Sequence, residues 1–157
     1  MAAERSQWEV AFQFGREWKD VNRRLRHAGE KDLARELRKA VREAAKPGRN
    51  AAKLAARAIP VKGPRSTGLR RRMARGVGIQ ADARRVRIVT RMPSGLEMLP
   101  RGFDTAKGWR HPVFGNRERW VTQPGHPWFR QTIAKTAPKA REEMKQAMDR
   151  VAARIAQ

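Results

Sequence analysis

The chain has 157 residues and no cysteine, and its 37 lysines and arginines against 15 aspartates and glutamates give a net charge of +22. This length predicts one domain, and the lack of cysteine excludes disulfides and thiolate metal sites. A positive charge of this size predicts that the protein contacts polyanions, acidic partners or neighbouring subunits. The sequence has neither an apolar run of the roughly 20 residues that a membrane span needs nor a secretory signal, so we expect a soluble protein made in the cytosol.

The first third of the chain predicts a short strand and two helices. Apolar and polar side chains alternate from Trp8 to Phe14, as in a strand with one buried face. A helix follows from Gly15 and stops at the "HAG" of residues 27–29. A second helix opens near Glu30, and its apolar phase continues beyond Pro47. We interpret it as one helix bent near Pro47, with two helices that meet at "KPG" as the alternative. The alanines after this proline predict a close helix contact.

The middle of the chain predicts two loops and a hairpin. Prolines and glycines in "IPVKGPRSTGLRRRM", residues 59–73, predict a basic loop at 60–75. The runs "ARGVGIQ" and "RRVRIVTR" follow, and their β-branched residues around "ADA" predict an antiparallel hairpin. Residues 92–108 show no period, which predicts a long loop.

The last third predicts a brief strand and a long helix. The strand lies around Val113 and Phe114, and Pro112 gives it the character of an edge. The helix begins near Pro127–Trp128 and carries an apolar seam to the end of the chain, while Pro138 predicts a bend or a later start. Together these elements predict a single α+β domain over residues 1–157, with long N-terminal helices, a small antiparallel sheet built on a central hairpin, and a long C-terminal helix.

Residue types that bind metals are sparse. The histidines are His27, His111 and His126, and a zinc site would need them together with Asp104 or Glu118. No two of the histidines have the spacing of ligands on one helix. We therefore interpret them as structural or surface residues and expect no metal and no cofactor.

Nucleophilic catalysis has equally little support. Ser66 and Thr67 lie in "KGPRSTG", which lacks the Gly-Lys-Ser/Thr order of a phosphate-binding loop. Most carboxylates lie on predicted helices beside Lys or Arg, as solvated ion pairs do. A small hydrolase that uses Ser66, His111 or Asp104 is the weakest hypothesis. We expect no enzymatic activity and no small-molecule substrate.

A basic segment is the strongest signal, because no carboxylate occurs between Glu43 and Asp82. The residues expected to contact a partner are Lys62, Arg65, Arg70, Arg71, Arg72 and Arg75. Double-stranded DNA and an acidic protein neighbour fit these side chains equally, since the arginine fork pairs with phosphate and carboxylate alike. Aromatic residues do not alternate with these arginines, which argues against a stacking platform for single strands.

A run of prolines and aromatic residues, "RWVTQPGHPWF" at 119–129, predicts a rigid corner before the last helix. Prolines restrict the unfolded chain, and buried aromatic rings are strong anchors. We expect the rings to anchor the helix to the sheet. The corner residues are Trp120, His126, Pro127, Trp128 and Phe129.

Four motifs follow one another along the chain: Ala58–Pro60 at the end of a long Ala/Arg-rich helix that contains "AAKP", Thr67–Arg70 before a basic hairpin, Phe114–Gly115 within "HPVFG", and His126–Phe129 within "PGHPWFRQTI". In this order they resemble the small tail-component family of long-tailed double-stranded DNA bacteriophages, and the likeness covers residues 33–157. Two features depart from the family pattern. Val113 replaces an acidic residue that often precedes the aromatic-Gly step, and the dipeptide "GP" at residues 63–64 lengthens the loop.

The resemblance implies a virion structural protein of the head–tail junction or upper tail, made in the cytoplasm of the bacterial host. It implies a homo-oligomeric ring, a hexamer or a dodecamer, that completes the tail or joins it to the head. Other neck and tail proteins and the double-stranded DNA of the channel would be its partners. The resemblance implies no catalytic residue, cofactor or membrane. A basic architectural DNA-binding protein is the alternative, which tight duplex binding by a monomer would favour.

Overall fold

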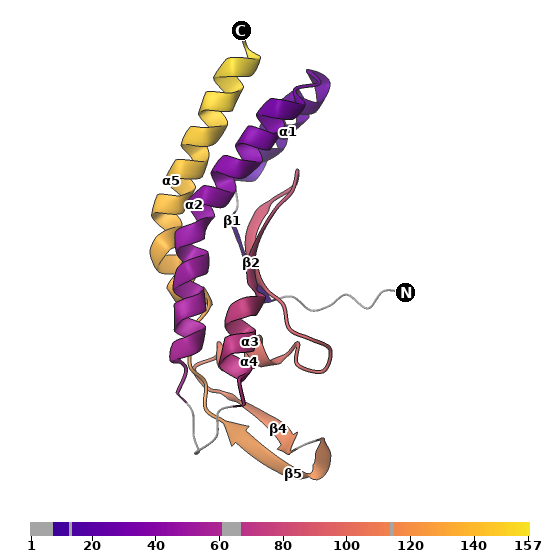
Figure 1. Ribbon diagram of the computed structural model, residues 1–157, viewed down its shortest axis with the longest axis vertical. Coiled ribbons are helices and arrows are strands. Elements are labelled where there is room, and N and C mark those ends of the chain that lie inside the picture. Colours follow the sequence, from indigo (N-terminus) through magenta and orange to yellow (C-terminus); the bar gives the residue numbers. More distant parts are fainter. Residues whose placement is uncertain (1–7, 13, 61–66, 114) are drawn as a thin grey trace.

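The computed structural model describes residues 8–12, 14–60, 67–113 and 115–157, which form helices and antiparallel strands (Figure 1). The first elements in the chain are β1 (Trp8–Phe12), α1 (Gly15–His27), α2 (Lys31–Ala58), α3 (Leu69–Gly76) and β2 (Val77–Ala81). They are followed by β3 (Val86–Thr90), α4 (Leu99–Phe103), β4 (Trp109–Val113), β5 (Asn116–Gln123) and α5 (Arg130–Ile155). The expected α+β class, with a small antiparallel sheet and a long C-terminal helix, is confirmed.

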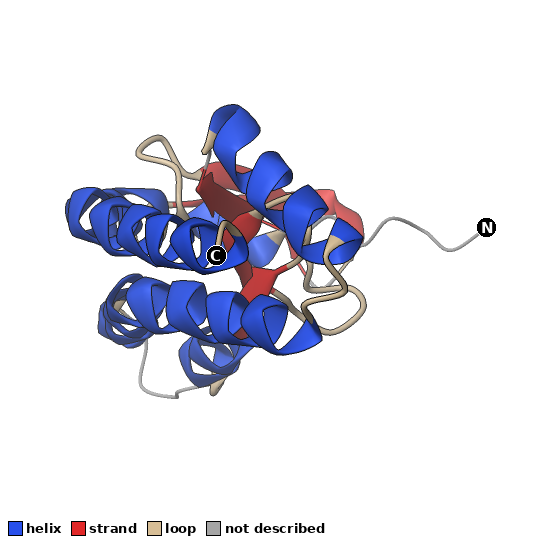
Figure 2. Cartoon of the chain, turned by 90° about the horizontal axis from the view of Figure 1, so that it is seen from above, coloured by secondary structure: helices blue, strands red, loops and turns tan. Residues whose placement is uncertain are grey.

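Helices α2 and α5 lie side by side and run in opposite directions (Figures 1 and 2). The buried face of α2 carries small residues, among them Ala44, Ala45 and Gly48, so the two backbones approach closely. A Cβ added at Gly48 would lie 2.8 Å from Oγ1 of Thr136 on α5, which leaves no room for a larger residue there. The close helix contact expected from the alanines is present, and small residues create it.

Both long helices continue through an internal proline. Pro47 lies within α2 and Pro138 within α5, and both are exposed. The carbonyl that loses its backbone partner to Pro47 belongs to Glu43, a residue that is also exposed, so the lost bond lies on the solvent side of the helix. The single helix through Pro47 is therefore confirmed, whereas two helices that meet at "KPG" and a start of α5 after Pro138 are wrong.

A three-stranded antiparallel sheet in the order β1-β3-β2 packs against α2. In the central strand, Ile88 lies opposite Val10 on one side and Ile79 on the other. Ile88 is fully buried, and its Cδ1 lies 3.0 Å from the position that a Cβ of Gly48 would take. The expected hairpin of the two middle strands is confirmed, and the N-terminal strand completes its sheet.

Two segments expected to be loops contain helices. Gly68 takes a positive φ of 72°, which suits glycine, and α3 starts directly after it at Leu69. Met73 and Ala74 are the buried residues of α3. Two neighbouring apolar residues are too few to show a helical period in the sequence. The basic loop at 60–75 is therefore helical from Leu69 onward, while residues 61–66 lie outside the described part of the chain. The loop at 92–108 contains α4.

A second hairpin, β4–β5, forms a separate two-stranded sheet at the opposite end of the molecule from the C-terminus (Figure 1). The strand expected around Val113 exists but begins at Trp109, and Phe114 lies outside the described residues. Strand β5 is an element that the sequence pattern does not predict. Its sequence, "NRERWVTQ", is exposed from Asn116 to Thr122 and buries neither face, so it has no alternation to detect.

Candidate functional site

Asp104 organises the corner that precedes α5. Its Oδ1 accepts the backbone N–H groups of Trp128 and Phe129 at 2.9 and 2.7 Å, and its Oδ2 accepts that of Arg130 at 3.3 Å. Such N–H groups at a helix start have no partner within the helix, so Asp104 caps α5 from a distant part of the chain. Oδ2 also accepts the indole N–H of Trp8 at 2.9 Å. These bonds make Asp104 a structural residue.

Backbone packs directly against backbone in the same corner. A Cβ added at Gly125 would lie 1.5 Å from the carbonyl oxygen of Thr105, and one at Gly108 would lie 2.0 Å from that of Gln123. Real Cβ atoms do not come this close to other heavy atoms. Only glycine therefore fits at these two positions.

Trp128 and Phe129 are the aromatic anchors of the corner. Their side chains are 2% and 0% exposed, and their ring centroids lie 5.2 Å apart. The indole N–H of Trp128 donates to the carbonyl of Pro100 at 3.1 Å, and the backbone N–H of His126 donates to the carbonyl of Phe103 at 2.7 Å. This part of "PGHPWF" therefore forms a rigid corner, with Pro127 on its exposed side.

The anchoring role expected for Trp120 is wrong. Its side chain lies on β5, outside the three-stranded sheet, and 46% of it is exposed. The indole N–H donates to the carbonyl of Arg117 at 2.6 Å, and the guanidinium of Arg110 lies 5.5 Å from the ring centroid. The ring is thus held in one position on the surface without being buried.

Within the described ranges, no three His, Asp or Glu side chains lie close enough together to hold a metal ion. Nδ1 of His111 lies 3.1 Å from the carbonyl of Pro112, and the His27 side chain is exposed at the end of α1. Glu118 is exposed on β5, away from Asp104 in the corner. The structure does not bring these candidate ligands together. Ser66 lies outside the described residues.

The basic residues expected to contact a partner fall into three groups. Lys62 and Arg65 lie outside the described residues. Arg70 donates through Nη1 to the carbonyls of Ile59 and Arg57, so it caps the C-terminal end of α2. The remaining three residues are exposed on α3: Arg71, Arg72 and Arg75.

A longer line of cations, which we call the α2 row, follows one side of α2. Its members recur every three or four residues, the spacing of a single helix face. They are Arg35, Arg38, Arg42, Lys46, Arg49, Lys53 and Arg57. The row spans about 33 Å at the helical rise of 1.5 Å per residue. The spacing of the row is visible in the sequence, whereas the partner contacts expected from the sequence lie in the basic loop at 60–75.

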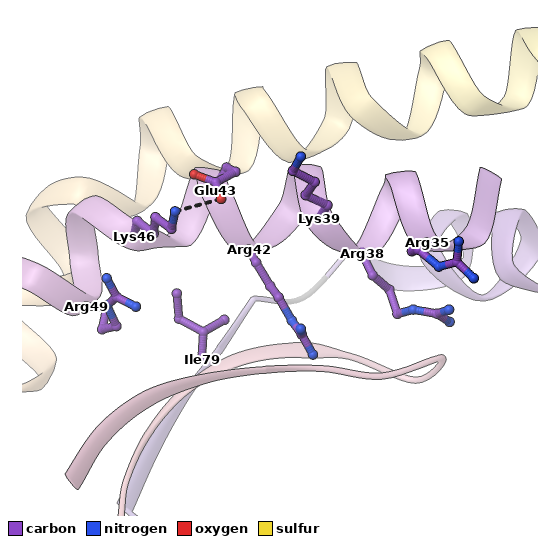
Figure 3. Close-up of a pocket in the computed structure, with 8 residues that line it drawn as sticks. All are labelled: Arg35, Arg38, Lys39, Arg42, Glu43, Lys46, Arg49 and Ile79. Carbon is purple, nitrogen blue, oxygen red and sulfur yellow. Dashed lines mark ion pairs between the residues drawn. The ribbon is translucent and has the colours of Figure 1, made fainter. Parts of the chain in front are cut away.

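Most of the α2 row lines an open groove of about 490 Å³ between α2 and β2 (Figure 3). Ile79 of β2 is its apolar element, and Arg42 extends from α2 toward the strand. Among the described residues of the lining, Glu43 is the only acidic one, and its Oε1 lies 2.7 Å from Nζ of Lys46. The hydrogen bond from Lys46 lowers the pKa of Glu43, and the charges of Lys46, Lys39 and Arg49 add to this effect.

A second basic cluster adjoins the row at the turn between β2 and β3. An open hollow there is lined by Lys19, Arg23 and Arg26 of α1 and by Ala83, Arg84 and Arg85 of the turn. Asp82 shapes this turn, since its Oδ1 accepts the backbone N–H groups of Arg84 and Arg85 at 2.8 and 3.0 Å. Burial raises the pKa of Asp82, but these hydrogen bonds and the Arg87 and Arg85 charges outweigh it, so the pKa is lowered.

Comparison with known proteins yields no family assignment. No protein-family model matches the sequence, and no curated protein or solved structure matches it. None of the helices in the described part of the chain is long and apolar enough to cross a membrane. Two surfaces of this molecule bear on its function: the α2 row and the β4–β5 hairpin.

Proposed function

We propose that this chain is a structural protein of the neck or upper tail of a long-tailed bacteriophage, where identical copies form a ring. The ring would complete the tail or join it to the head. The order of motifs from residue 33 to the C-terminus supports the setting. The exposed β4–β5 hairpin is the observation that carries the assembly role.

The β4–β5 hairpin has the properties of an arm that contacts another chain. Every residue from Asn116 to Thr122 is exposed, although an isolated two-stranded hairpin is marginally stable in water. At its base, Trp109 packs edge-on against Phe103, with ring centroids 4.7 Å apart. The base is therefore anchored, while the rest of the arm gains little burial within its own subunit.

Trp120 and Val121 give each face of the arm an exposed apolar side chain. They are 46% and 41% exposed, and tryptophan is among the residues that contribute most to protein interfaces. The contacts of Trp120 with Arg117 and Arg110 fix its ring in advance, which reduces the entropy lost on binding. An arm at one end of the molecule that contacts a different face of the next copy gives a head-to-tail interface, and such an interface forms a ring when the rotation between copies closes.

The test is the assembly state of the purified chain, measured by light scattering after gel filtration and by negative-stain microscopy. We expect rings for the wild type. The double variant Trp120→Ser/Val121→Ser should stay monomeric with an unchanged circular dichroism spectrum. Leu54→Ser, at a residue 66% exposed on α2, is the matched control and should still assemble.

A wild-type chain that remains monomeric at all concentrations, or rings that form despite the double substitution, would contradict the proposal. In the virus, particles without this protein should contain heads and tails that fail to stay joined. Stable infectious particles would also contradict it.

The α2 row favours a second candidate, a basic architectural DNA-binding protein that acts outside a virion. This candidate predicts a monomer that binds duplex DNA with a steep salt dependence. Gel filtration separates the two candidates, because only the first requires a closed oligomer.

A further inference from the structure

The α2 row has the length and charge of a contact with a nucleic-acid backbone. We propose that it binds the phosphates of double-stranded DNA. Its length of about 33 Å is close to one helical turn of duplex DNA, roughly 34 Å, and it presents a cation about every 5.5 Å. This inference does not depend on ring formation, because the row belongs to a single subunit.

Most charges of the row lack an intramolecular counter-ion. Five members form no ion pair with any described acidic residue: Arg38, Arg42, Arg49, Lys53 and Arg57. The exceptions are Arg35, which pairs with Asp32 at 3.1 Å, and Lys46, which pairs with Glu43. The unpaired cations are available to contact DNA phosphates, and each such contact releases counter-ions that are condensed on the DNA.

The row lacks the features of a protein–protein interface. Such interfaces have an apolar centre with aromatic anchors and few charges. The described residues that line the groove beside the row include one apolar side chain, Ile79, and no aromatic residue. The exposed Trp120 and Val121 lie on the β4–β5 arm, in another part of the molecule. A polar, strongly positive surface is typical of contacts with DNA, so phosphate is favoured over the carboxylates of an acidic protein.

The neighbouring basic cluster widens this surface. A hollow lined by Arg26 of α1, Ala83 of the β2–β3 turn, and Arg35 and Arg38 of α2 connects the cluster to the row. Cations from three elements therefore border one continuous surface. A duplex that lies along α2 would therefore meet cations of both the row and the cluster.

The test is binding of the full-length chain to a fluorescent 30-base-pair duplex, measured by anisotropy between 50 and 300 mM KCl. In the variant Arg38→Gln/Arg42→Gln/Arg49→Gln, three phosphate contacts are removed. The slope of log K against log salt should then become less steep by about 2.7, at roughly 0.9 per contact, and affinity near 0.1 M should fall by about two orders of magnitude.

The matched control removes the same net charge from exposed positions on α5, as Lys135→Gln/Arg141→Gln/Lys145→Gln. It should change the slope by less than about 1. Equal losses in the two triple variants would overturn the proposal, because the binding would then reflect overall charge alone.

Poly-L-glutamate serves as the competing probe. If it displaces the duplex at matched charge concentration and salt, an acidic protein is the partner and the DNA proposal fails. Circular dichroism of each variant shows that folding is retained, and light scattering follows assembly separately. A chain that forms rings but whose α2 row does not bind DNA would overturn this inference alone, and a monomer that binds DNA through the row would overturn the proposed function alone.

Discussion

The two hairpins of this chain are stabilised in different ways. Strands β2 and β3 join β1 in a sheet that packs on α2, and the central strand is buried along most of its length. Strands β4 and β5 pair only with each other, and most of β5 is exposed. The first hairpin is held by its own side chains, and the second by the corner at its base. Substitutions should therefore reduce stability most at the centre of the first hairpin, but at the base of the second.

The largest effect is expected at Gly125, at the foot of β5. In Gly125→Ala the new Cβ would clash with the Thr105 carbonyl, and the backbone of the corner must move. We expect a loss of more than about 4 kcal/mol in the free energy of unfolding, measured by urea denaturation. The control is Gly78→Ala in β2, where a Cβ meets nothing within 4 Å and stability should change by less than about 1 kcal/mol.

Trp128→Ala removes the buried anchor of the corner and should cost about 3–5 kcal/mol. The loss of the hydrogen bond to Pro100 adds to the cavity that the indole leaves. The stabilities of this variant and of Trp120→Ala are compared by thermal unfolding. The exposed Trp120 should tolerate alanine within about 0.5 kcal/mol, and equal effects of the two variants would contradict the assignment of the anchor.

A matched pair tests the two hairpins directly. Ile88→Ala, at the centre of the buried sheet, should destabilise by about 2–5 kcal/mol, because a cavity forms beneath α2. Val121→Ala, on the exposed arm, should change the monomer by less than about 0.5 kcal/mol. Urea denaturation of both variants measures the difference. A large loss for Val121→Ala would show that the arm is packed within its own subunit.

Asp104→Ala tests how the corner supports the second hairpin. It removes the cap of α5 and leaves the Trp8 indole N–H without its acceptor, at a cost of about 2–3 kcal/mol. Hydrogen exchange should show faster opening of the first turn of α5. Asp104→Asn keeps one carbonyl acceptor and should lose less stability. Equal stability of the alanine variant and the wild type would refute the capping role.

The smallest effect is expected at the turn of the first hairpin. Because the pKa of Asp82 is lowered from its ordinary value of 3.8, its carboxylate stabilises the fold above that pH, and the contribution is lost as pH falls through the lowered pKa. Asp82→Asn should reduce the free energy of unfolding at pH 7 by less than about 1 kcal/mol, because this group is largely exposed. The difference from wild type should narrow below pH 3.8. A gap that stays constant with pH would contradict this.

The sequence predicted the elements whose side chains have a buried face. The period of α2 persists through Pro47, and the β-branched residues of β2 and β3 are spaced as in a hairpin. Strand β5 was not predictable in this way, because its polar residues are exposed on both faces. The aromatic anchors Trp128 and Phe129 could be expected from their proline-rich context. Their partner Asp104 could not, since it lies 24 residues earlier in a segment without a period.

The candidate site was predicted in part. The absence of acidic residues between Glu43 and Asp82 indicated a basic surface, and the contacts expected at residues 62–75 stay a prediction. The cations that line the groove lie earlier in the chain, on α2. Arg70 shows that charge alone does not identify a residue that contacts a partner, because its guanidinium donates a hydrogen bond to a carbonyl at the end of α2. The spacing of the α2 row is visible in the sequence, and its cations share one face because the helix continues through Pro47.

The bond between Trp8 and Asp104 joins residues 96 positions apart and has a consequence for synthesis. While the ribosome is still producing the first two-thirds of the protein, the opening strand cannot reach this acceptor, and the start of α5 does not yet exist. Strand β1 can pair with β3 once that strand has emerged, but Trp8 should lack its side-chain acceptor until Asp104 is present, and the corner should stay open until α5 begins. Chains arrested before residue 128 are expected to be digested quickly by protease.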